Sequence, residues 1–143
     1  VKYGKTDTVA FLLQQRANPD IPGFNGFTAL TLAAMWGKED SSKLLVENGA
    51  DINHKDNDGL TLLHDATIKR SGELLEFLVL KGAQIDIKDK DGMTPLHILA
   101  CSTQQHVEMY RLLIEKYPGT LITKDKWGGR VIRCTMEMGH DVT

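Results

Sequence analysis

Apolar side chains recur along this 143-residue chain at a fixed step of 33 residues. Leucine takes the same place at Leu30, Leu63 and Leu96, and Leu45 and Leu78 follow the first two of these after 15 residues. A fixed period between about 20 and 50 residues is the sequence signature of stacked-repeat architectures. The spacing therefore predicts a solenoid of helix-turn-helix units, in which function lies on an extended surface rather than in a buried pocket.

Polar and turn residues keep the same step. Glycine recurs at Gly26, Gly59 and Gly92, and each is followed two residues later by a threonine, at Thr28, Thr61 and Thr94. A threonine hydroxyl accepts hydrogen bonds from the free amides of a helix start, so these threonines are predicted N-caps. Pro95 then stands at the first helical position, where its missing N–H costs nothing. The last two glycines fit turns that need positive φ, which a side chain resists by roughly 1–3 kcal/mol.

Two motifs in this pattern resemble the ankyrin repeat. One is Gly92-Met93-Thr94-Pro95-Leu96-His97, and the other is the stretch from Leu44 to Asn53, a paired-leucine helix followed by Gly-Ala-Asp-Ile-Asn. A tetratricopeptide array has a similar period but a tryptophan and tyrosine pattern that is missing here. The resemblance covers essentially the whole chain in about four and a half units. It implies an all-α ankyrin-repeat solenoid with short β-hairpin fingers.

The units that we expect are about 1–22 (partial), 23–55, 56–88, 89–124 and 125–143 (partial), all in a single domain. The first keeps only its second helix, Asp7 to Gln15, with Val9, Leu12 and Leu13 as its apolar stripe. The fourth is irregular, with extra residues expected between Cys101 and His106. Because neither end holds a complete unit, we expect the chain to be a piece of a longer one.

Composition narrows the class of protein. Hydrophobic residues make up 41% and charged residues 25%, which is ordinary for a soluble globular protein. A net charge of −2 gives no basic footprint for a nucleic acid, and no apolar run approaches a membrane span. Two cysteines are few for a secreted fold. We expect an intracellular protein, cytoplasmic with a nuclear location left open, without cofactor or small-molecule substrate.

Two constellations suggest chemistry that the repeat explains better. Asp56, Asp58, Gly59 and Asp65 match positions of an EF-hand calcium loop, but His54 stands at its first position. His97 and Cys101 share a helix face as a ligand pair or a nucleophile and base would, yet two ligands do not complete a tetrahedral metal site. We therefore expect neither a metal site nor an enzyme.

A partner-binding surface is the remaining hypothesis, and Trp36 is its centre. The resemblance places Trp36 on the concave face, where large aromatic residues are typical binding hot spots. The alternative is that Trp36 covers a loop or packs on a neighbouring side chain. The residues that would continue the same face are Met35, Asp65, Lys69, Arg70 and Ile98. Hairpin tips would add Lys55, Lys88, Lys90 and Trp127, for which a solvated rim is the alternative.

The resemblance also suggests a modification. Some ankyrin repeats are substrates of an asparaginyl hydroxylase that reads a leucine eight residues before the target and an acidic residue two before. Leu45, Asp51 and Asn53 have this spacing, so Asn53 is a candidate for hydroxylation. The repeat consensus alone produces the same spacing.

These observations favour a protein–protein interaction module that presents a concave helix face and hairpin tips to another protein. Two alternatives stay open. The chain is a regulatory segment of a larger enzyme or channel whose catalytic or membrane part lies elsewhere, or it is a structural subunit of a large assembly.

Overall fold

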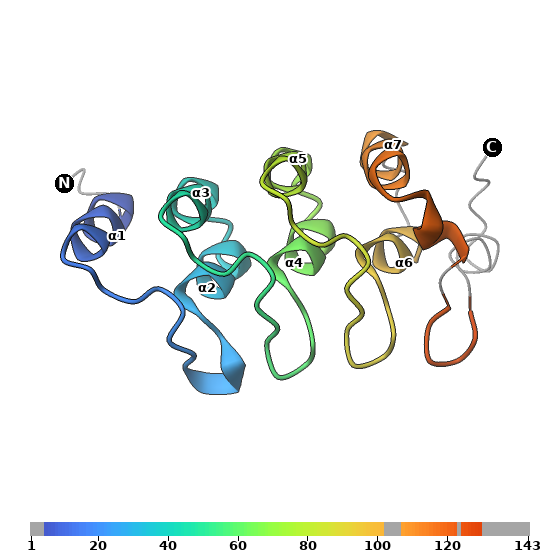
Figure 1. Ribbon diagram of the computed structural model, residues 1–143, viewed down its shortest axis with the longest axis horizontal. Helices are drawn as coiled ribbons and strands as arrows, with labels where there is room; N and C mark the ends of the chain where they lie inside the picture. The colour runs from blue at the N-terminus through green and yellow to red at the C-terminus, as the bar shows by residue number, and fades with distance from the viewer. Residues whose placement is uncertain (1–4, 102–106, 123, 130–143) are drawn as a thin grey trace.

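The computed structural model describes residues 5–101, 107–122 and 124–129, which form a row of repeated helix pairs (Figure 1). The first helices of the pairs are α2 (Ala29–Met35), α4 (Leu62–Ile68) and α6 (Pro95–Ala100). The second helices are α1 (Lys5–Gln14), α3 (Glu39–Glu47), α5 (Gly72–Leu80) and α7 (Val107–Lys116). Two 3-10 helices, η1 (Phe24–Gly26) and η2 (Pro118–Ile122), lie in the connections.

The helices stand in two rows (Figure 1). In one row α2 packs on α4 and α4 on α6, and in the other α1 packs on α3, α3 on α5 and α5 on α7. Within the pairs, α2 packs on α3, α4 on α5 and α6 on α7. The predicted all-α solenoid is confirmed. No helix in the described part of the chain is long and apolar enough to cross a membrane.

The leucines that set the 33-residue step form the core. Leu30, Leu63 and Leu96 on the first helices are almost completely buried. Leu78 and Leu113 on the second helices are fully buried. Leu113 thus takes a core position even though the fourth unit has extra residues, and the expected site of insertion at 102–106 lies outside the described residues.

The apolar stripe predicted for the first unit is only partly right. Val9 and Leu13 pack against the core, but Leu12 is 49% exposed. Its equivalent one step later, Leu45, is buried because α2 covers α3. Among the described residues no helix covers α1 in that way.

Each finger between two helix pairs is a tight turn built on an aspartate. The backbone N–H of Asp56 donates to the carbonyl of Leu60 at 3.0 Å, and its carboxylate accepts from the N–H groups of Asp58 and Leu60. Asp89 and Asp125 begin the same turn in the next two fingers. The described fingers contain these turns without extended β-strands, so the predicted hairpins are present only as turns.

The turn glycines are needed for two reasons. Gly59 and Gly92 have φ of 76° and 73°, as predicted. In addition, a Cβ on Gly59 would lie 2.8 Å from the backbone nitrogen of Lys90, and one on Gly92 would lie 2.7 Å from that of Lys126. The fingers therefore approach one another so closely that a side chain at either glycine would clash with the backbone of the next finger.

The predicted threonine caps begin the first helices, and a histidine completes two of them. The Thr94 hydroxyl accepts from the N–H of His97 at 3.3 Å, and the N–H of Thr94 donates back to His97 Nδ1 at 3.2 Å. The N–H of Thr61 donates to His64 Nδ1 in the same way, so His64 Nε2 carries the proton and donates to the carbonyl of Met93 at 2.9 Å. His64 thus joins the third unit to the fourth.

Candidate functional site

An apolar hollow lies beside the end of α2. Its volume is about 490 Å³, and it is lined by Gly23 and by Phe24, Phe27, Leu32, Met35 and Trp36, which we call the Trp36 patch. Trp36 is 75% exposed directly after the last residue of α2, and Phe24 is 91% exposed at the start of η1. Trp36 and Met35 are predicted from the sequence to contact a partner, whereas Phe24, Phe27 and Leu32 are not.

The next unit shows which part of this surface belongs to the scaffold. α4 is flanked by α2 on one side and α6 on the other, so it shows each repeat position in a complete stack. At the positions of Met35 and Trp36, α4 and its last turn carry Ile68 and Lys69, and both stay exposed there. These two positions therefore face solvent even where a neighbouring unit is stacked.

Three other positions on α2 behave differently. Ala29, Leu32 and Ala33 correspond to residues of α4 that are buried: Leu62, Asp65 and Ala66. The α2 residues line a second hollow of about 330 Å³, together with Val9 of α1 and Trp36. This part of α2 is the stacking face that α4 buries against α2, so its exposure follows from its place at the start of the described stack.

Asp65 differs from the expectation that it lies exposed on the partner-binding face. Only 8% of it is exposed, since it occupies the stacking position held by Leu32 one unit earlier. It lines a cavity of about 210 Å³ between α2 and α4, and its Oδ2 atom has no hydrogen-bond partner among the described residues. Burial, with added repulsion from Asp56 and some opposing attraction from Lys69, raises the pKa of Asp65 to about 7.

The other residues expected beside Trp36 are accessible to different degrees. Lys69 and Arg70 are exposed at the end of α4, and Arg70 has a positive φ of 58°. Ile98 on α6 is half-buried. Lys69 shares the cavity of Asp65 with Lys38, and Lys38 also lines the second hollow with Trp36. The structure therefore connects Trp36 with Lys69 through Lys38, which sequence reasoning did not name.

The lysines expected at the hairpin tips brace one finger against the next. Lys55 Nζ donates to the carbonyl of Lys88 at 3.0 Å, and Lys88 Nζ donates to the carbonyl of Lys124 at 3.1 Å. Lys90 forms an ion pair with Asp58 at 2.7 Å. All three lysines remain exposed. These bonds give them a role in holding the fingers together, whatever partner they meet.

Trp127 is the second exposed tryptophan. It lies in the last described finger, and the ammonium of Lys126 stands 4.4 Å from the centre of its ring. It is far along the chain from the Trp36 patch and shares no described hollow with it. The structure thus gives the expected partner contacts two separate locations.

Asn53 takes part in the contact between successive units. Its side-chain oxygen accepts from the backbone N–H of Gln84 at 2.9 Å, and its own N–H donates to the carboxylate of Asp51. It is half-buried. Its hydroxylation stays a prediction.

The residues that suggested metal or nucleophilic chemistry have structural tasks. His97 is buried in the helix cap described above, whereas Cys101 is exposed at the end of α6. The carboxylate of Asp56 accepts two backbone hydrogen bonds within its own turn. In the described ranges no group of three or more His, Cys, Asp or Glu side chains is placed to hold a metal ion.

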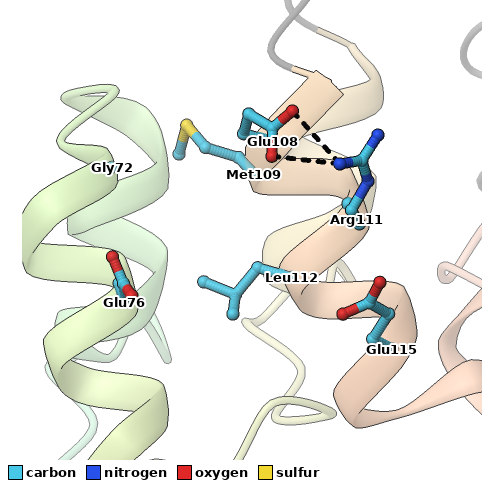
Figure 2. Close-up of a pocket in the computed structure, with 7 residues that line it drawn as sticks. All are labelled: Gly72, Glu76, Glu108, Met109, Arg111, Leu112 and Glu115. Atoms are coloured by element: carbon cyan, nitrogen blue, oxygen red, sulfur yellow. Dashed lines mark hydrogen bonds and ion pairs between the residues drawn. The ribbon is translucent and has the colours of Figure 1, made fainter.

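A further hollow of about 300 Å³ lies between α5 and α7 in the row of second helices (Figure 2). Glu76, Glu115 and the pair of Glu108 and Arg111 surround it, with Met109 and Leu112 between them. Its charged groups are exposed. None is a buried polar group that aims at a ligand, so the Trp36 patch is the better-formed site.

The comparison with protein families agrees with the geometry. A family model described as ankyrin repeats (3 copies) matches residues 1–89 and 63–140. A comparison with curated proteins found no match. The paired helices, the threonine–histidine caps and the finger glycines are the features that carry the family pattern in the described residues. Together with the match over most of its length, they show that the chain belongs to the ankyrin-repeat family.

Proposed function

We propose that this chain is a protein-binding module whose main contact surface is the Trp36 patch. Ankyrin repeats are generally protein–protein interaction modules and are typically non-catalytic. The observation that carries the location is the exposure of Met35 and Trp36, because the equivalent positions of α4 stay exposed inside the stack. An exposed apolar surface that stacking does not explain is typical of an interaction site.

The scaffold supports such a role by holding the patch in a fixed geometry. The Thr28 cap and the packing of α2 on α3 and α4 hold Met35 and Trp36 at the end of α2, and Phe24 lies in the hydrogen-bonded finger that precedes α2. A partner that docks there orders few side chains, and little conformational entropy is lost on binding. Aromatic side chains at the centre of such a surface contribute the most to affinity.

Affinity capture from a native extract tests the location. Trp36→Ala should remove the captured partner, since truncating a central tryptophan costs about 2 kcal/mol or more of binding free energy. Trp127→Ala is the matched control because it removes the same side chain from an exposed position on another surface. If only Trp127→Ala loses the partner, the contact surface lies on the fingers. If wild type, Trp36→Ala and Trp127→Ala all capture the same proteins, the Trp36 patch is not the contact surface.

A further inference from the structure

We propose that the Trp36 patch, together with Lys38 and Lys69, binds an acidic amphipathic segment of a partner protein. Apolar side chains of the segment fill the hollow of the patch, and its carboxylates lie over the two ammonium groups. This inference rests on the proposed function and adds the chemical class of the partner.

The arrangement of the hollows places Lys38 next to Trp36 and Lys69 next to Lys38. Trp36 and Lys38 both line the hollow of about 330 Å³ at the stacking face of α2, and both of these side chains are exposed. Lys38 and Lys69 line the adjoining cavity of about 210 Å³. Since Lys69 is also the residue that follows the end of α4 as Trp36 follows the end of α2, the three side chains form a continuous strip from one unit to the next.

The positive charge of this strip is not cancelled by ion pairs within the described residues. The ion pairs there join Lys43 to Glu73, Lys90 to Asp58, Arg111 to Glu108 and Lys126 to Asp91. None involves Lys38 or Lys69, although both are exposed. The strip therefore keeps two cations available to a partner.

The carboxyl groups beside the strip offset the two cations only in part. Glu39 lines the cavity with the lysines and contributes one negative charge, and its carboxylate accepts a hydrogen bond from the hydroxyl of Ser71. Asp65 is buried, and its raised pKa of about 7 leaves it only partly ionised at neutral pH. The two lysines therefore outweigh Glu39 and the partly ionised Asp65, and this excess of positive charge favours acidic partners and disfavours basic ones.

The apolar part of the site restricts the partner further. The hollow of about 490 Å³ is lined by apolar side chains and one glycine, so it accepts an aromatic or aliphatic side chain without a polar partner. A purely acidic peptide would leave this surface exposed, and a purely apolar one would leave the lysines unused. A segment with both kinds of side chain satisfies both parts of the surface.

Binding of three short synthetic peptides to the full 143-residue chain tests the inference. All carry Leu and Phe at helical spacing, and their other positions are all Glu, all Gln or all Lys. Binding is measured by fluorescence anisotropy of the labelled peptide at low and high salt. We expect the Glu peptide to bind most tightly and to weaken as salt screens its charges. Trp36→Ala should weaken binding of all three peptides.

Charge reversal tests the lysines themselves. Lys38→Glu with Lys69→Glu should weaken binding of the Glu peptide about tenfold and improve that of the Lys peptide, because two exposed charge pairs change sign. Lys38→Gln with Lys69→Gln removes the charges with less risk to folding and should give a smaller loss. The matched control is Lys81→Glu with Lys116→Glu. These exposed lysines lie at the ends of the second-row helices α5 and α7, so their reversal should leave the affinity for each peptide unchanged.

The outcomes separate the two proposals. Equal affinities for the three peptides, or insensitivity to both lysine variants, would overturn the acidic partner, while continued loss with Trp36→Ala would still support the patch. If Trp36→Ala changes no affinity, or if none of the peptides binds, both the patch and its acidic partner are wrong.

Discussion

Asp65 should make the stability of this protein depend on pH in an unusual direction. Its carboxyl group is buried between α2 and α4, and its Oδ2 atom has no hydrogen-bond partner in the described structure. Burial, then repulsion from Asp56, raises its pKa from 3.8 to about 7, against the attraction of Lys69. The folded protein therefore holds the proton more tightly than the unfolded chain does. The resulting stabilisation is complete below the unfolded pKa and is lost as the pH rises through the folded one.

The size of the effect follows from the shift. One pKa unit corresponds to 1.36 kcal/mol, so a shift of roughly 3 units corresponds to about 4 kcal/mol over the whole range. About 3 kcal/mol of this should be lost between pH 5 and pH 8.5. This loss is large against the 5–15 kcal/mol of unfolding free energy that is typical of a whole domain.

Urea unfolding of wild type and Asp65→Asn across this pH range measures the effect. The difference between the two proteins is the informative quantity, because burial lowers the pKa of His64 and makes stability fall as the pH drops below about 6.5 in both. Asp65→Asn should gain stability relative to wild type steadily as the pH rises. Glu115→Gln is the control, because it replaces a carboxyl group by an amide at an exposed position. Its free energy of unfolding should depend on pH as that of wild type does. Parallel curves for wild type and Asp65→Asn would refute the reasoning.

Two further predictions concern the scaffold. Gly59→Ala should lower the free energy of unfolding, measured in urea, by more than Gly82→Ala does. Both glycines have positive φ, which costs a side chain about 1–3 kcal/mol, but only a side chain at Gly59 would also meet the next finger. Equal losses of stability would show that the fingers separate easily. Leu63→Ala should lower the free energy of unfolding by about 2–5 kcal/mol because Leu63 is buried. Leu12→Ala should lower it far less because Leu12 is half exposed. Comparable losses of stability would mean that Leu12 is covered in solution.

The periodic residues allowed the fold to be predicted, because each repeats a local physical requirement. Thr94 caps a helix, Gly92 occupies a turn with positive φ, and Leu96 fills the core between two helix rows. The repeat also indicates which positions are buried by stacking. Asp65 stands one step from Leu32, an apolar residue, and this equivalence indicates a stacking position rather than a surface one.

The candidate site was only partly predictable for a different reason. Trp36 was recognisable because the ankyrin resemblance places it on the concave face, where a large aromatic residue is typical of a binding site. Phe24 lies in a finger rather than on a helix face, so helical spacing alone did not place it beside Trp36. The bond from Lys55 to the carbonyl of Lys88 joins two residues exactly one step apart. Repetition of lysine at that step was a usable signal for bracing, but the backbone acceptor leaves no trace in the sequence.

Repetition in this chain also separates scaffold from function better than exposure alone does. Leu32 and Trp36 are both exposed apolar residues at the same end of the molecule. One step later, the position of Leu32 is buried against the preceding unit, while that of Trp36 remains open. A stacked unit would therefore cover the first residue and leave the second free. For this reason an interaction at Trp36 does not compete with the growth of the solenoid, and one centred on Leu32 would.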